Sequence, residues 1–311
     1  MICKFKKIVA VDETLLNEQA LAALVQRADS VVVYHDFPRE EQEVVCRIGD
    51  ADCLLVSFHT PIGKNVLSAC PALRYVGMCC TLYSPESSNV DVSEARKRGI
   101  TVTGIKDYGD EGVVEYVISE LVRLLHGFGP YCWHGRPCEL THQHVGIIGL
   151  GKTGRMIADA LQFLGAEIRY FSRTRKPEAE QAGMSYSSLP DLLQWADIVC
   201  TCLPRNNYLL GHEEFSLFGN GKILVNTSIG PTFELEALKC WLSSCLDNYY
   251  LCDATGMGNL AKQLSSFPTV LYTPHISGMS VQSIGRLSEK VLANMDAFLA
   301  KQIQGAEGAS L

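Results

Sequence analysis

The sequence predicts an α/β protein of two domains, each built around a parallel β-sheet. Apolar runs rich in Val, Ile and Leu alternate with amphipathic, helix-like stretches along almost the whole chain. The length of 311 residues fits two domains better than one. Hydrophobic residues make up 47% of the chain and charged residues 20%, so both domains can bury a core, and disorder is excluded.

The first hundred residues predict one sheet with its helices. Strands are expected at 8–11, 31–34, 53–57, 75–78 and 101–103, and helices at 14–27, 40–48 and 92–98. Gly99 is expected to end the last of these helices. Continuous apolar strands separated by helices indicate a parallel sheet that is covered on both faces.

A second series of strands predicts the second sheet. A long apolar helix at 112–125 and an irregular stretch at 126–144 precede it. Its strands are expected at 145–148, 167–171, 197–202, 222–227, 249–253 and 270–272. A final helix should span about 279–301, and the small polar tail from Gln302 should fray.

Charge and hydropathy exclude several classes of partner. The net charge of −7 argues against a nucleic-acid surface, and no apolar run is long enough for a membrane span or a signal peptide. A cytoplasmic protein is therefore expected. Its thirteen cysteines are expected to be reduced and mostly buried. A Cys/His group at 132–144 matches no familiar zinc spacing, so an irregular connector is favoured there and no metal site is predicted.

A glycine-rich turn carries the strongest functional signal. Gly149, Gly151 and Gly154 follow a buried strand without a gap and open a helix. In such a turn the first glycine permits the sharp bend, the second lets a pyrophosphate approach, and the third lets the helix pack on the strand. Free backbone N–H groups, here those of Lys152 and Thr153, then face the phosphates. The sequence predicts a dinucleotide-binding Rossmann domain.

The end of the next strand predicts which dinucleotide is bound. An NAD site usually has Asp or Glu at that point, whereas Ser172, Arg173 and Thr174 stand here, followed by two more cations. A hydroxyl and an arginine suit a 2′-phosphate. NADP(H) is therefore the preferred cofactor and NAD(H) the second choice; a solvated basic turn is the alternative.

Several further motifs resemble the D-isomer-specific 2-hydroxyacid dehydrogenase family. They are 71–76, 89–91, 99–102, 113–116, the glycine turn, 224–228, Asp253 and 273–278. The resemblance implies a flavodoxin-like substrate-binding domain from residues 1–108 and 279–311 and an NAD(P)-binding Rossmann domain from residues 109–278. It also implies hydride transfer between the nicotinamide and a small-molecule substrate in a cleft between segments 78–88 and 151–275, and a homodimer. The cofactor-binding residues that it implies are Gly149, Gly151, Lys152, Thr153, Gly154, Ser172, Arg173, Thr174, Cys202, Pro204, Thr227, Ser228, Asp253, His275 and Gly278.

The catalytic residues depart from that family. Its chemistry uses an Arg on the substrate carboxylate, a His as proton donor or acceptor, and a Glu that orients the His. His275 matches the His, but Ile229 stands at the Arg position and Gly256 at the position assigned to the Glu. The carboxylate-binding loop, 78–88, is long and poor in glycine, and the dimerisation arm within 115–146 is short.

Three functions are consistent with this pattern. The first is an NADPH-dependent reductase with a non-standard cleft, in which His275 is the catalytic residue and the substrate is not a standard 2-oxo acid. The second is an NADP(H)-binding sensor or scaffold without turnover. The third is an ordinary 2-hydroxyacid dehydrogenase whose cation is replaced from elsewhere. The candidates to replace it are Arg205, Arg74 and Lys106, with Tyr83 or Tyr108 as hydrogen-bond donors.

Overall fold

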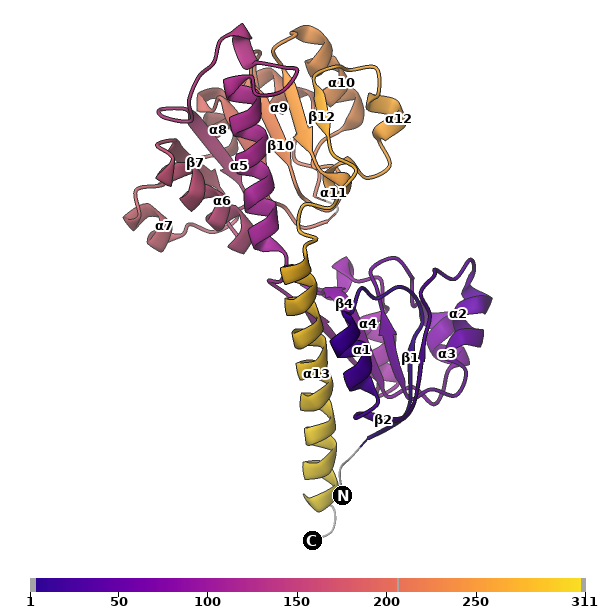
Figure 1. Ribbon diagram of the computed structural model, residues 1–311. Helices are drawn as coiled ribbons and strands as arrows, with labels where there is room; N and C mark the ends of the chain where they lie inside the picture. Colours follow the sequence, from indigo (N-terminus) through magenta and orange to yellow (C-terminus); the bar gives the residue numbers. More distant parts are fainter. Residues whose placement is uncertain (1–3, 206, 309–311) are drawn as a thin grey trace. The chain divides into compact units, whose positions relative to one another are not determined.

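The computed structural model describes residues 4–205 and 207–308. The chain divides into two compact units, Met1–Tyr108 with Val281–Leu311, and Gly109–Ser280 (Figure 1). Each unit contains one all-parallel sheet with helices packed on it, which confirms the predicted α/β class.

The first unit has five strands, β1 (Phe5–Ala10), β2 (Ala28–Val33), β3 (Cys53–Val56), β4 (Tyr75–Thr81) and β5 (Thr101–Ile105). Their order in the sheet is β2-β1-β3-β4-β5, and every pair is parallel. This is the flavodoxin-like order. Short helices connect the strands: α1 (Glu18–Leu24), α2 (Glu41–Ile48), α3 (Lys64–Ala69), η1 (Pro85–Ser87) and α4 (Val92–Lys97).

The last helix, α13 (Val281–Gly308), completes this first unit. Its apolar face, which includes Met295 and Phe298, packs into the core formed by β1, β3 and β4. The Phe298 ring stacks on Phe5 with 5.6 Å between ring centroids. Residues far apart in the sequence therefore share one core. The helix continues to Gly308, seven residues past the predicted end at 301, so that predicted end is wrong; residues 309–311 lie outside the described part.

The second unit has seven strands in the order β12-β11-β10-β9-β6-β7-β8. They are β6 (His144–Ile148), β7 (Glu167–Phe171), β8 (Ser185–Tyr186), β9 (Ile198–Thr201), β10 (Ile223–Asn226), β11 (Tyr249–Cys252) and β12 (Val270–Tyr272). The chain reverses its direction of travel across the sheet between β6 and β9, which is the Rossmann arrangement. In such sheets, ligands bind at the carboxyl ends of the strands beside this reversal.

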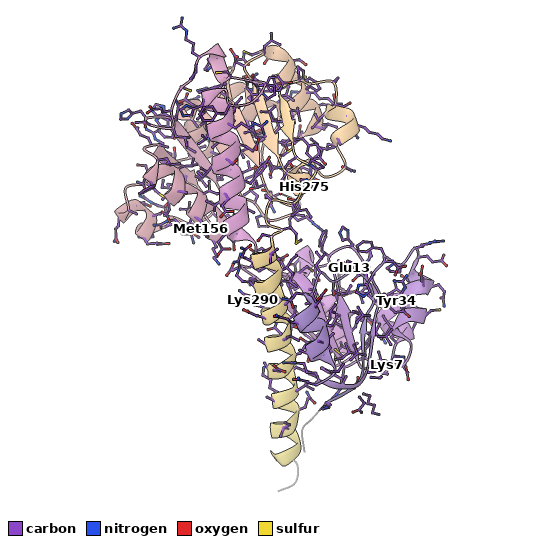
Figure 2. The ribbon with its side chains drawn as sticks, in the orientation of Figure 1. Lys7, Glu13, Tyr34, Met156, His275 and Lys290 are labelled. Carbon is purple, nitrogen blue, oxygen red and sulfur yellow. The ribbon has the colours of Figure 1, made fainter. Side chains whose placement is uncertain are left out.

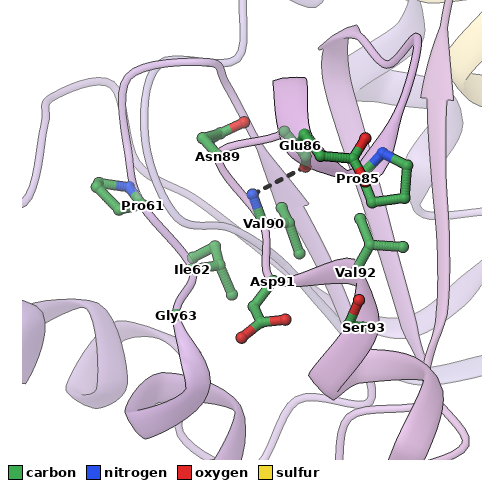
Figure 3. A pocket seen from close by; sticks show the side chains of 11 residues that line it. Pro61, Ile62, Gly63, Pro85, Glu86, Asn89, Val90, Asp91, Val92 and Ser93 are labelled. Carbon is green, nitrogen blue, oxygen red and sulfur yellow. Dashed lines mark hydrogen bonds between the residues drawn. The ribbon is translucent and has the colours of Figure 1, made fainter.

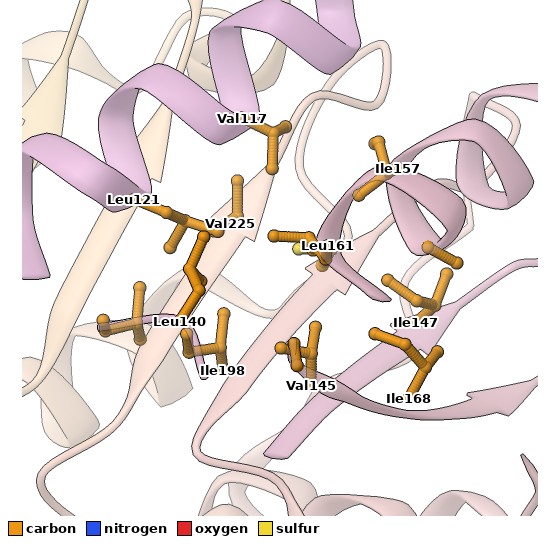
Figure 4. Close-up of a cluster of buried hydrophobic side chains, with 14 of the residues drawn as sticks. Val117, Leu121, Leu140, Val145, Ile147, Ile157, Leu161, Ile168, Ile198 and Val225 are labelled. Atoms are coloured by element: carbon orange, nitrogen blue, oxygen red, sulfur yellow. The ribbon is translucent and has the colours of Figure 1, made fainter. Parts of the chain in front are cut away.

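Helices cover both faces of the second sheet. They are α5 (Asp110–His126), η2 (Trp133–Gly135), α6 (Lys152–Phe163), α7 (Pro177–Gln181), α8 (Leu189–Trp195), α9 (His212–Phe218), α10 (Leu235–Ser244), α11 (Ala254–Met257) and α12 (Ala261–Leu264). On one face, Val117 and Leu121 of α5 meet Ile157 and Leu161 of α6 above the strands (Figure 4). On the other, Phe215 and Phe218 stack on Trp241.

Some local predictions were wrong at their boundaries. The helix expected from residue 14 begins at Glu18, because Leu15 has a φ of 60°, which no α-helix accepts, and Asn17 caps the helix by accepting a hydrogen bond from the Ala20 amide. Helix α3 and strand β8 were not predicted from their short patterns.

Within residues 4–205 and 207–308, no helix is long and apolar enough to cross a membrane. The cysteines of the described segments are all free thiols, and no three His, Cys, Asp or Glu side chains there gather as metal ligands.

Candidate cofactor and catalytic site

The glycine-rich turn joins β6 to α6, and its three glycines do three different things. Gly149 has a φ of 97°, and a side chain there would collide with the carbonyl oxygen of Cys202. A side chain at Gly154 would collide with the carbonyl oxygen of Gly149. At Gly151, by contrast, no atom lies within 4 Å of where a Cβ would stand. The protein's own packing needs the first and third glycines, and the second leaves open space at the start of α6, which fits a pyrophosphate.

The first two residues of α6 contact a carboxylate that the sequence did not single out. The Thr153 hydroxyl donates to Oδ1 of Asp110, the first residue of α5, and Lys152 Nζ lies 3.5 Å from Asp110 Oδ2. The Asp110 side chain is only 8% exposed. It lies 43 positions before Thr153, and no motif links the two, so only the packing of α5 against α6 brings them together.

The end of β7 presents the residues predicted to distinguish NADP(H) from NAD(H). Ser172 Oγ donates to the Thr174 carbonyl at 2.5 Å, which shapes the turn. Arg175 is engaged with Glu180 at 3.0 Å, an ion pair that lowers the pKa of that carboxyl group. Arg173 is exposed and has no partner among the described residues. Of the two arginines, Arg173 is therefore the one open to a ligand.

The residues that follow β9 and β10 mainly form hydrogen bonds with the backbone near the glycine-rich turn. Cys202 donates its backbone N–H to the Ile148 carbonyl at 2.8 Å, and burial raises the pKa of its thiol to about 12, so it stays neutral. Ser228 is buried, and its hydroxyl donates to the Thr201 carbonyl and accepts from the Leu203 amide. Pro204 is exposed and Thr227 half-buried at the same edge of the sheet.

Asp253, at the end of β11, holds the segment that carries the predicted catalytic histidine. Its Oδ1 accepts from the Gly256 amide at 2.8 Å and the Thr255 hydroxyl at 2.6 Å. Its Oδ2 accepts from the Ser277 amide at 2.8 Å and the Ser277 hydroxyl at 2.6 Å. The Ala254 amide adds a hydrogen bond to the His275 carbonyl. With four donors, this buried carboxylate is already satisfied within the protein, so its role is to position residues 275–277.

Known proteins match this arrangement. The sequence model of the "D-isomer specific 2-hydroxyacid dehydrogenase, NAD binding domain" matches residues 132–277. The chain is 27% identical over 321 residues to a hydroxypyruvate reductase of Blautia hydrogenotrophica, covering 94% of this chain and 97% of that one. It is 29% identical over 290 residues to a glyoxylate reductase of Thermococcus kodakarensis, covering 85% and 84%. The fold matches D-lactate dehydrogenase from Aquifex aeolicus with a TM-score of 0.78 and 19% identity, over 97% and 98% of the two chains.

Residues 132–277 thus match the NAD-binding-domain model of the D-isomer-specific 2-hydroxyacid dehydrogenases, and most of the chain is similar to hydroxypyruvate and glyoxylate reductases.

Two positions that the family resemblance assigns to catalytic side chains carry residues without a charge. Ile229, which the resemblance assigns to the position of the family's arginine, is 44% exposed. Gly256 has no room for a side chain, since a Cβ would collide with the Asn226 carbonyl oxygen. Residues 254–274 contain no Asp or Glu at all, so no neighbouring position of that segment supplies the carboxylate either. The exposed His275 (Figure 2) forms no side-chain hydrogen bond with the described residues.

The residues considered as replacements for the arginine have varied surroundings. Arg74 donates to Asp52 at 2.9 Å and lies 5.0 Å from the centre of the Phe5 ring, so it is already engaged in the first unit. Lys106 lies 5.4 Å from the centre of the Tyr83 ring. Burial raises the pKa of Tyr108, which keeps its hydroxyl protonated. Arg205 is half-buried on the loop after β9.

The altered loop of the first unit forms one wall of an open groove. Strand β4 runs on to Thr81, and η1 follows within the segment that the family usually keeps short. The groove has a volume of about 410 Å³ and is lined by residues 61–63, 85, 86 and 88–93 (Figure 3). Two carboxylates, Glu86 and Asp91, and no cation are among these lining residues. This groove therefore does not favour an anionic ligand.

Proposed function

We propose that this protein is an NADPH-dependent reductase of a carbonyl substrate that is not a standard 2-oxo acid. The observation that carries the proposal is Ile229, an apolar side chain at the position of the family's carboxylate-binding arginine, at the same sheet edge as a complete glycine-rich turn. Burying a substrate carboxylate without a cation costs several kcal/mol. A neutral carbonyl compound avoids that cost.

The choice of NADPH rests on Arg173 and Ser172. Arg173 is open to solvent and needs no rearrangement to bind a 2′-phosphate, and its planar guanidinium can donate two hydrogen bonds to phosphate oxygens. The open position at Gly151 and the N-terminus of α6 would hold the pyrophosphate. When bound, the cofactor supplies the hydride.

His275 would donate the proton to the substrate oxygen. Asp253 accepts hydrogen bonds from the amide and hydroxyl of Ser277, two residues after His275, and the Ala254 amide donates to the His275 carbonyl. The histidine is thus positioned by its main chain, while its ring remains free to meet a substrate. A ring without a carboxylate partner is a weaker acid–base group than the family's His–Glu pair.

A second candidate function is NADP(H) binding without turnover, as a sensor or scaffold. The observation that favours it is the lack of any acidic residue between 254 and 274 together with the unpartnered His275 ring. Cofactor binding is expected under both proposals, so binding alone does not separate them.

Steady-state oxidation of NADPH over a carbonyl panel tests the proposal. The panel contains glyoxylate, hydroxypyruvate and pyruvate beside aldehydes and ketones without a carboxylate. Reduction of the second group, at least tenfold faster than of the first, is expected. Ile229→Arg should then raise activity on glyoxylate, since it restores a cation at the family's position. Fast reduction of glyoxylate by the unaltered protein would contradict the proposal, and cofactor binding without turnover on any compound would favour the second candidate.

A further inference from the structure

A buried carboxylate, that of Asp110, contacts the first turn of α6, the helix whose N-terminus is proposed to bind the cofactor's phosphates. Among the described residues, Asp110 Oδ2 is one of two buried side-chain polar atoms without a hydrogen-bond partner; the other is Trp133 Nε1. Its other oxygen accepts from the Thr153 hydroxyl in the first turn of α6. Lys152, the first residue of the same helix, has its ammonium 3.5 Å from the unbonded oxygen. A negative charge in this place is unusual, because the site is expected to receive an anion.

The surroundings of Asp110 explain why it is tolerated without a cofactor. Asp110 is the first residue of α5 and contacts the first turn of α6, so its charge lies at the N-termini of two long helices. Helix N-termini stabilise anions. Lys152 adds a cation, and its side chain is 44% exposed, so it can move. Asp110 therefore supplies internally the negative charge that a pyrophosphate would otherwise supply.

We propose that Asp110 determines the affinity of the dinucleotide site by competing with the cofactor's phosphates for Lys152 and for the N-terminus of α6. The proposal rests on the proposed cofactor site at the glycine-rich turn. When the cofactor binds, Lys152 turns from Asp110 to the phosphates, and the carboxylate remains as a buried like charge beside them. The side chain at position 110 thus lowers the affinity for both NADPH and NADH, in contrast to Arg173, which should distinguish between the two.

Fluorescence titration of NADPH and NADH against Asp110→Asn tests this competition. The amide keeps an acceptor for the Thr153 hydroxyl and removes the charge. We expect both dissociation constants to fall about fivefold or more, since a unit charge at short range in a partly buried site outweighs solvent screening. The midpoint of thermal unfolding of the cofactor-free protein should fall at the same time, because the ion pair with Lys152 is lost. A purely structural role would weaken binding instead.

Asp159→Asn is the matched control. Asp159 is on α6, the helix that carries Lys152 and Thr153, and forms an ion pair with Arg155 at 2.8 Å, so its substitution removes one negative charge from α6 but not from its first turn. Its dissociation constants should stay within twofold of the unaltered protein. A gain equal to that of Asp110→Asn would mean that net charge alone acts, and the proposal would be wrong.

Lys152→Met tests whether Asp110 and the cofactor compete for this lysine. In the unaltered protein the lysine is shared with Asp110, so losing it should weaken cofactor binding less than the same change in the Asp110→Asn background. Asp110→Ser replaces Asp110→Asn if the latter does not fold. Affinity that is unchanged within twofold, or weaker, in both position-110 variants overturns the competition. If neither the unaltered protein nor any variant binds a dinucleotide, the proposed cofactor site is wrong, and so is the competition. If only the position-110 variants bind, the competition is supported, but the proposed NADPH-dependent function of the unaltered protein is not.

Discussion

Two regions at the same edge of the second sheet differ in how closely they match the family resemblance. The glycine-rich turn and the end of β7 have the features predicted for a dinucleotide site, including an open space at Gly151 and an exposed Arg173 that has no partner among the described residues. The segments after β10 and β11 have backbone supports such as Asp253, but carry Ile229 and Gly256 at the positions that the resemblance assigns to charged groups. The side chains proposed for cofactor binding and those proposed for catalysis are therefore different, although one sheet positions both sets.

The sharpest test of this contrast is His275→Ala. If the protein turns over, we expect its rate to fall at least a hundredfold, since general acid catalysis typically contributes about 10²–10⁴. The dissociation constant of NADPH should change by less than about threefold, because the phosphates are bound by other residues. Steady-state rates with the best carbonyl substrate and cofactor titration measure the two effects. Full activity in the variant would show that another group donates the proton.

The next effect is expected at the glycine turn. Gly151→Val places a side chain in the space proposed for the pyrophosphate, and NADPH affinity should fall by about a hundredfold, equivalent to about 2.7 kcal/mol. The midpoint of thermal unfolding of the free protein should hardly change, because no atom lies within 4 Å of the new Cβ. Gly154→Val is the comparison: its Cβ would collide with the Gly149 carbonyl, so it should destabilise the free protein. Unchanged affinity in Gly151→Val would place the phosphates elsewhere.

The smallest effect concerns the choice between the two dinucleotides. Arg173→Ala should weaken NADPH binding by about 1–3 kcal/mol, the range of a charge-assisted contact, and leave NADH nearly unchanged. Arg175→Ala is the matched control, because that arginine is already engaged with Glu180. Parallel titrations of both dinucleotides measure the preference. Equal or tighter binding of NADH by the unaltered protein would contradict the assignment of NADP(H).

The comparison also separates what local sequence can predict from what it cannot. The glycine turn was predictable because the positive φ of Gly149 and the close contact of Gly154 with the Gly149 carbonyl both arise within one strand, one turn and one helix. Arg173 and Arg175 look equivalent in the sequence, and only the position of Glu180 on α7 distinguishes them. The unusual φ at Leu15 shortened α1 although the apolar pattern continued. Short elements such as α3 and β8 escaped prediction because tertiary packing stabilises them more than local preference does.

By itself, the sequence determined the α/β class and the glycine-rich turn, and it led to the prediction that Ile229 takes the position of the family's arginine. Each of these is a local pattern or a single substitution, which spacing and residue chemistry reveal directly. Only the tertiary structure decided that Asp110 contacts Thr153 and Lys152, and that Asp253 is satisfied by Gly256 and Ser277. These contacts join segments from different helices and strands. Their positions depend on how whole elements pack, and no local periodicity encodes that.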